Sequence, residues 1–117
     1  MAQERYTALN GKYLEDAEAL LAQGDYPQAS EKLWGAVATA IKTVAAARRW
    51  RHHSHNQLRA VIKGLHQETG DREFSDLFAT AEALHANFYE NFAAPDEVRQ
   101  HSQSARLLID QVLAQLR

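Results

Sequence analysis

The sequence predicts an all-α protein, an antiparallel up-and-down helical bundle of four main helices plus one short helix. Two observations lead to this fold class. Apolar residues recur three and four positions apart through almost the whole chain, which is the spacing of an amphipathic helix. Glycine and proline interrupt these runs at short breaks, and short connections between long helices require antiparallel neighbours. No segment shows the alternating pattern of a strand.

The first two helices are expected over about residues 3 to 23 and about residues 27 to 49. Gly24 and Asp25 end the first helix as a C-terminal glycine and a turn residue would. Pro27 suits the first turn of the second helix, where its missing N–H costs nothing. Many alanines accompany the large apolar residues of this second helix, so it lacks a polar face of normal width. We therefore expect it to lie in the centre of the bundle.

Three further helices are expected in the C-terminal half. Ser54 and Gln57 match a capping box, in which the serine oxygen accepts from a backbone N–H and the glutamine reaches back to the serine N–H. Asp71 is expected to cap the fourth helix, and Pro95 to begin the fifth, whose apolar stripe extends to Leu116. The face of the fourth helix that we expect in the core comprises Phe74, Leu77, Phe78, Ala81, Leu84, Phe88 and Phe92.

The composition is that of an ordinary soluble globule, with 117 residues, 45% of them hydrophobic and 24% charged, and it predicts one domain over residues 1–117. A formal net charge of -2 argues against a surface that is basic throughout, but it leaves room for a local basic patch. The absence of cysteine excludes disulfides and thiolate chemistry. No signal peptide or membrane span is recognisable, so we expect a cytoplasmic protein that does not bind membranes.

The stretch RRWRHHSHN, residues 48–56, concentrates cationic and histidine side chains in this slightly acidic chain. One interpretation is structural: the arginines offset the negative end of the helix dipole and Trp50 covers the helix end. The other is an anion or nucleotide site at the start of the third helix, where backbone N–H groups and guanidinium groups would meet a phosphate. The residues expected to form that site are Arg48, Arg49, Arg51, His55 and Arg59.

The histidines of this stretch are also candidate metal ligands. His53 and His55 are spaced to chelate from an extended loop, with His52 beside them, but zinc and similar ions require three or four ligands in fixed geometry, and no acidic residue or further histidine adjoins the stretch. We therefore predict no metal and no cofactor. His85 and Tyr89 lie four positions apart on one face of the fourth helix, and this face is the other candidate for a functional surface.

The N-terminal half resembles one tetratricopeptide hairpin, because Gly24, Asp25 and Tyr26 are followed by Ala29 and Leu33. That resemblance implies a peptide-binding adaptor. It covers about a quarter of the chain, and neither a closing proline nor a second copy follows. We keep it as a second alternative.

A wider resemblance covers nearly the whole chain, through GDY, ASEKLWGAVATAIKTVA, SHNQL, LHANFYENF and RLLIDQVLAQL in that order. These segments resemble the HEPN superfamily of small helical domains, and within it the PaREP branch. A His-x-x-Leu step opens the third helix in that superfamily, here His55 and Leu58, and an aromatic step near the end of the fourth helix corresponds to Phe88 and Tyr89. The resemblance implies a bundle that commonly dimerises and is found beside nucleotidyltransferases or in toxin–antitoxin and RNA-processing systems.

Active members of the superfamily resemble one another in an arginine followed four to six residues later by a histidine near the fourth helix. Here residues 84–89 read LHANFY and contain no arginine. The required spacing occurs only before the third helix, as Arg49 with His55 and Arg48 with His53. We therefore expect a non-catalytic homodimeric domain that binds a nucleotide, an RNA or a partner protein. A divergent metal-independent ribonuclease is the first alternative.

Overall fold

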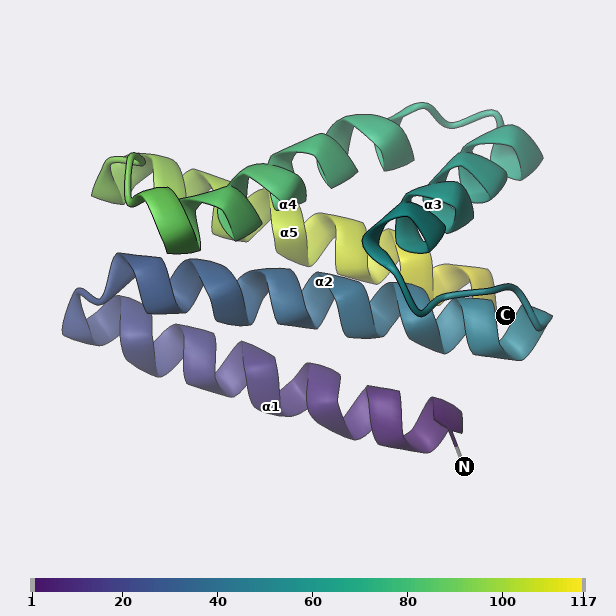
Figure 1. Ribbon diagram of the computed structural model, residues 1–117, viewed down its shortest axis with the longest axis horizontal. Coiled ribbons are helices and arrows are strands. Elements are labelled where there is room, and N and C mark those ends of the chain that lie inside the picture. Colours follow the sequence, from purple (N-terminus) through teal and green to yellow (C-terminus); the bar gives the residue numbers. More distant parts are fainter. Residues whose placement is uncertain (1, 117) are drawn as a thin grey trace.

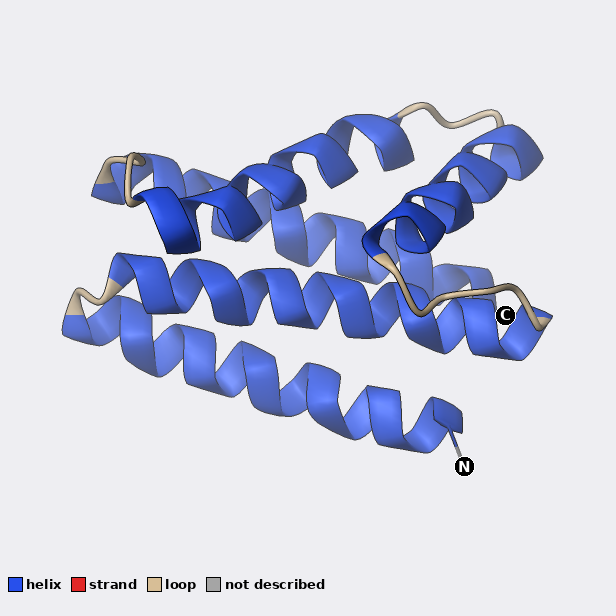
Figure 2. Ribbon diagram, viewed as in Figure 1, coloured by secondary structure: helices blue, strands red, loops and turns tan. Residues whose placement is uncertain are grey.

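The computed structural model describes residues 2–116, and it folds them almost entirely into helices joined by short links (Figures 1 and 2). The helices are α1 (Ala2–Gln23), α2 (Tyr26–Arg48), α3 (His55–Thr69), α4 (Glu73–Glu90), α5 (Pro95–Leu113) and the short 3-10 helix η1 (Ala114–Leu116). The described residues contain no strand. The predicted all-α bundle is confirmed, and both ends of α1 and of α2 lie within one residue of their expected positions.

Helix α2 is the centre of the bundle, as the sequence predicts. It packs against α1, α3, α4 and α5, and Figure 1 shows it between α1 on one side and α4 and α5 on the other. Six consecutive residues, 36–41, are all buried. Because an α-helix has 3.6 residues per turn, six buried residues in a row leave no side of the helix facing water at this level.

The shorter helix α3 lies obliquely across the C-terminal half of α2 and packs against α4 (Figure 1). Its amphipathic stripe is buried as expected, through Leu58, Val61, Ile62 and Leu65. The long link of residues 49–54 connects α2 to this helix, and it carries the basic stretch along the outside of the bundle.

The helix starts follow the predicted capping chemistry with two corrections. Ser54 Oγ accepts from the Gln57 N–H at 3.1 Å, as expected, but the Gln57 side chain accepts from the His53 N–H at 2.7 Å, one residue before the serine. The expected capping box is therefore only half formed, because the glutamine accepts from the backbone N–H of His53 and not from that of Ser54. Asp71 Oδ1 accepts from the Glu73 N–H at 2.9 Å, and α4 begins at Glu73, so Asp71 is not itself the N-cap residue.

The end of α4 differs from the expected apolar face. The helix ends before Asn91, which adopts a left-handed conformation with φ of 46°, and Phe92 therefore leaves the core-facing side and is 59% exposed. Near the end of α4 the buried side chain is that of Asn87. Its Nδ2 donates to Ser30 Oγ at 3.0 Å and its Oδ1 accepts from the Ala93 N–H at 2.8 Å. A polar residue thus fixes the link to α5.

The C-terminal turn also differs from the expected stripe. Leu116 is exposed because the chain changes from α5 to the tighter η1, which turns the following side chains away from the bundle. Within residues 2–116, no helix combines the length and the hydrophobicity that crossing a bilayer requires.

Candidate functional site: a histidine–tryptophan cluster beside a basic link

Trp34 on α2 supports two histidines that come from different helices. The indole is almost completely buried, and the rings of His55 from α3 and His85 from α4 stack on it, each with its centroid 5.0 Å away. The interplanar angles are 24° and 27°. The structure therefore brings together two histidines that lie thirty positions apart in the sequence and that the sequence analysis assigned to two separate candidate surfaces.

The two imidazoles occupy the same face of the indole. Their ring centroids lie 6.0 Å apart. If the two imidazoles stacked on opposite faces of the indole, the distance between their centroids would be about twice the distance from each imidazole to Trp34. Their side chains are 39% exposed for His55 and 32% exposed for His85, so the pair faces solvent from a buried aromatic floor.

Each histidine is oriented by a carboxylate. His55 Nε2 donates to Glu82 Oε2 at 2.7 Å, and His85 Nδ1 donates to Glu31 Oε1 at 3.0 Å. A carboxylate only accepts, so these nitrogens carry the protons, and in the neutral tautomers His55 Nδ1 and His85 Nε2 are left with free lone pairs. Within residues 2–116, these two imidazole nitrogens have no hydrogen-bond partner.

Glu82 is the ionic centre of the cluster because it also accepts a hydrogen bond from Arg59. Partial burial alone would raise the pKa of Glu82, but the hydrogen bonds from Arg59 and His55, together with the positive charge of Arg59, outweigh burial and lower it. Glu82 is therefore ionised at neutral pH. The charge of Arg59 is largely neutralised by this contact, so Arg59 is not a free cation for a phosphate.

Tyr89 forms the outer edge of the cluster. Its ring makes an edge contact with His85, with centroids 5.6 Å apart, and it is 71% exposed. His85 and Tyr89 therefore lie on one face of α4. Trp34, Glu31 and Glu82 were not predicted as members of a site. The sequence does show that Glu31 lies three positions before Trp34 on α2 and that Glu82 lies three positions before His85 on α4. This spacing does not show that the two pairs of residues meet.

The arginines expected in the anion site divide into two groups. Arg48 pairs with Glu68 at 2.5 Å, and Arg59 with Glu82. Arg49 and Arg51 are exposed and have no carboxylate partner among residues 2–116. Two of the four guanidinium groups are thus paired with carboxylates, and the other two, those of Arg49 and Arg51, lie in the link.

Arg49 also carries backbone strain. It caps α2 in the left-handed conformation, with φ of 60°, at a position where glycine is usually found. A side chain in this conformation costs roughly 1 kcal/mol.

The remaining link residues have structural contacts. Trp50 packs on Gly64 of α3 and lies beside the Arg48 guanidinium, whose central carbon is 5.0 Å from the indole centroid, so it covers the helix end as expected. His52 Nδ1 donates to the Trp50 carbonyl at 2.8 Å, and its Nε2 accepts from the Tyr6 hydroxyl at 3.2 Å. Both nitrogens of His52 are therefore occupied. Among residues 2–116, no three His, Asp or Glu side chains converge as metal ligands would.

Comparisons with known proteins agree with this fold. Residues 5–109 match the profile of the archaeal PaREP1/PaREP8 family. A crystal structure of a protein from Sulfolobus solfataricus is similar, with a TM-score of 0.81 and 25% sequence identity, over 93% of this chain and 97% of that chain. Comparison with curated proteins gave no match.

The ionic centre of the cluster predicts a pH-dependent contribution to stability. Glu82→Gln should lower the free energy of unfolding at pH 7 by about 1 kcal/mol, a value reduced by partial exposure. Because the pKa of Glu82 is lowered in the folded state, its contribution is complete above the unfolded pKa of about 4.3 and is lost as the pH falls through the lowered folded value.

Urea denaturation from pH 7 to pH 3 measures this dependence. The difference between wild type and Glu82→Gln should disappear at the acidic end. Asp76→Asn, at an exposed carboxylate on the same helix, is the matched control and should show no such convergence. A constant difference across the whole range would contradict the assigned role of Glu82.

Proposed function

We propose that this chain, which belongs to the archaeal PaREP1/PaREP8 family, is a HEPN-like domain that binds RNA or a nucleotide through its basic link, as a homodimer and without cleaving its ligand. The observation that carries this proposal is the pair of free cations. Arg49 and Arg51 are exposed and form no ion pair with any residue that the structure describes, whereas the neighbouring Arg48 and Arg59 are each held by a carboxylate. Guanidinium groups with free donors bind phosphate in a forked geometry.

The backbone of the link supports the same function. Arg49 occupies a strained backbone position that glycine would fill at lower cost. The backbone conformation therefore does not explain why an arginine stands there. Trp50, between the two arginines, is fixed by Gly64 and holds the link against α3. The two cations are therefore displayed on a segment that is anchored between them.

The first prediction for this function concerns affinity. Arg49→Glu with Arg51→Glu should weaken binding of single-stranded RNA by at least about tenfold, because two attractive charges become repulsive. Wild-type affinity should fall with rising salt and depend little on base sequence. Fluorescence anisotropy with a labelled RNA at two salt concentrations measures both effects.

Two control variants separate binding from folding. Arg72→Glu changes the same charge at an exposed site in the α3–α4 link and should retain most of the affinity. Arg49→Gly removes one cation while relieving the left-handed strain, so it should weaken binding without lowering the melting temperature. If the double glutamate variant binds RNA and nucleotide as wild type does, the arginines serve only to end the helix.

The second prediction concerns assembly. Tyr89, in the last turn of α4, and Phe92, just beyond that helix, are both large and more than half exposed, which is an unusual amount of aromatic surface for one small domain. We expect light scattering at tens of micromolar to give twice the mass of one chain. Tyr89→Ser with Phe92→Ser should give a monomer, whereas Leu107→Ser, at an exposed apolar residue of α5, should not. A monomeric wild type would exclude the dimer.

A second candidate function is metal-independent cleavage of RNA, and the pairing of His55 with His85 favours it. Two imidazoles 6.0 Å apart, each oriented by a carboxylate, could serve as general base and general acid for attack by a 2′-hydroxyl. The cluster lacks a free cation for the phosphate, because Arg59 is engaged by Glu82. Losing such a contact costs roughly 3 kcal/mol of transition-state stabilisation, which favours binding without cleavage.

We therefore expect labelled single-stranded RNA to remain intact when it is incubated with wild-type protein in EDTA. The same assay includes His55→Ala and His85→Ala, with His101→Ala on α5 as the matched histidine control. Cleavage by wild type and by the control that both cluster variants abolish would make this second candidate the function.

A further inference from the structure

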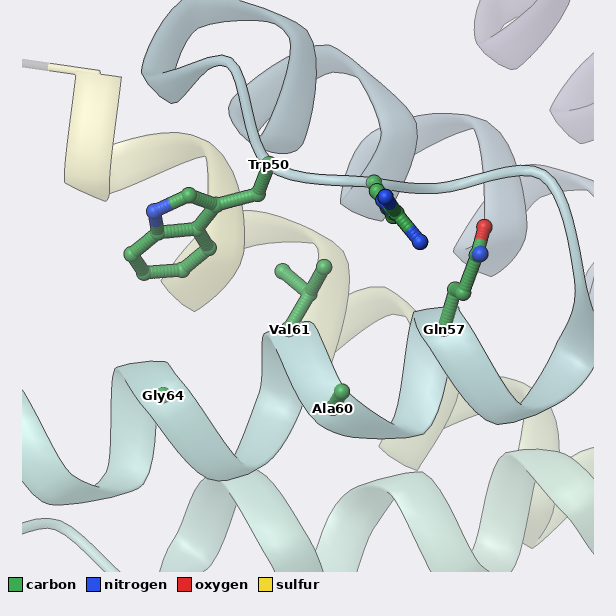
Figure 3. A pocket seen from close by; sticks show the side chains of 6 residues that line it. Trp50, Gln57, Ala60, Val61 and Gly64 are labelled. Carbon is green, nitrogen blue, oxygen red and sulfur yellow. The ribbon is translucent and has the colours of Figure 1, made fainter.

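An open hollow lies between the α2–α3 link and the outer face of α3 (Figure 3). Its volume is about 440 Å³, within the range of small-ligand sites. Figure 3 shows Trp50 and Gln57 at its two ends, with Val61 and Ala60 along α3 between them. The residues that line it are Trp50, Arg51, Gln57, Ala60, Val61 and Gly64. The hollow is outside the histidine–tryptophan cluster and next to the free arginines.

One wall of the hollow is held rigidly. Trp50 packs so closely on Gly64 that a Cβ atom there would lie 3.2 Å from two indole carbons. The backbone N–H of Trp50 donates to the Ala45 carbonyl at 2.8 Å, and Arg48, itself fixed by Glu68, lies beside the indole ring. A ligand therefore meets an aromatic wall that is already in position, which reduces the entropy lost on binding.

The lining defines the chemistry of the ligand. The floor of the hollow is apolar because, apart from Gln57, the α3 residues that line it are Ala60, Val61 and Gly64. Gln57 Oε1 is occupied by the His53 N–H, so the Gln57 amide offers its Nε2 as a donor. Arg51 contributes a guanidinium without a carboxylate partner. The matching ligand has a flat ring with apolar faces, hydrogen-bond acceptors on its edge, and a negative charge.

We propose that this hollow is a base-binding subsite, which receives one nucleobase while Arg51 binds the phosphate of the same nucleotide. The proposal rests on the proposed function, because it adds a ring-binding site to the anion-binding link. A nucleobase in the hollow would contact its apolar floor and the Trp50 indole. A hydrogen-bond acceptor on the edge of the nucleobase would meet the Gln57 amide. The nucleotide is either free or part of a single-stranded RNA.

The first test compares two probes that differ only in the base. Adenosine 5′-monophosphate and ribose 5-phosphate are titrated into wild-type protein and followed by calorimetry, with tryptophan fluorescence as a second signal. The adenosine nucleotide should bind at least about tenfold more tightly, which is the scale of contact between one base and an aromatic side chain.

The variant Ala60→Leu fills the hollow without changing any charge. Ala60 is exposed on α3 and leucine is a good helix former, so the fold should be retained. This variant should reduce the affinity for the adenosine nucleotide to that for ribose 5-phosphate, and it should leave the latter unchanged. Ala79→Leu, at an exposed alanine on α4, is the matched control and should bind both probes as wild type does.

The outcomes separate the subsite from the function on which it rests. Equal binding of both probes by wild type would overturn the base subsite while anion binding by the link stands. Binding of neither probe, nor of a short single-stranded oligoadenylate, would remove the proposed function together with the subsite. If Ala60→Leu binds the adenosine nucleotide or the oligoadenylate as tightly as wild type, the base lies elsewhere and the proposal is wrong.

The oligoadenylate also distinguishes the two sources of the nucleotide. Tighter binding of the oligoadenylate than of the mononucleotide, lost in Ala60→Leu, supports a subsite for RNA. Tighter binding of the mononucleotide, lost in the same variant, supports a subsite for a free nucleotide.

Discussion

Helix α2 has no side that faces water at residues 36–41, and the other helices are arranged around this constraint. All six of these residues are alanine or β-branched. Small side chains let neighbouring helices approach closely, and burying apolar surface is the main favourable contribution to folding. Helices α1, α4 and α5 cover α2 lengthwise, and α3 covers the sector that remains near its C-terminal end (Figure 1). The bundle is therefore arranged around one helix, and the links are routed outside it.

The same arrangement creates the histidine–tryptophan cluster. Trp34 lies on α2 where α3 and α4 meet it, and its indole is larger than the alanines on either side of the helix. Polar rings from the two outer helices cover it, His55 from the first turn of α3 and His85 from α4. Glu82 then joins α4 to α3 through His55 and Arg59. An ionic network at the surface thus completes the packing of a residue whose ring is in the core, because a half-exposed imidazole can stack on an aromatic ring and still donate to a carboxylate.

Much of the fold could be predicted from the sequence because helix periodicity, Pro27, Pro95 and the Ser54 cap are local signals. The errors occur where a tertiary contact overrides the local pattern. Phe92 continues the apolar spacing of α4, but Asn87 bonds the chain beyond the helix and allows Asn91 to turn it away. The cluster was predictable only in part, since the identity of His55 and His85 is visible in the sequence but their common partner is not. Which carboxylate neutralises which arginine depends on how α3 is inclined, and no spacing in the sequence records that angle.

Helix α3 is held at two places by aromatic contacts that use opposite parts of its length. His55 in its first turn stacks on Trp34, and Gly64 in its second half accepts the indole of Trp50. The chain between these contacts runs from Trp50 to His55 and carries Arg51, and Arg49 lies directly before Trp50 at the end of α2. A phosphate bound there would meet guanidinium groups on a backbone that folding has already ordered, which reduces the entropy lost on binding. Arg59, by contrast, pairs with Glu82 inside the cluster. There its positive charge favours the ionised form of Glu82, and the pair joins α3 to α4. The division of the arginines into free and paired groups is thus a consequence of how α3 is anchored: the cations next to the helix faces stabilise the bundle, and those on the link remain available for a ligand.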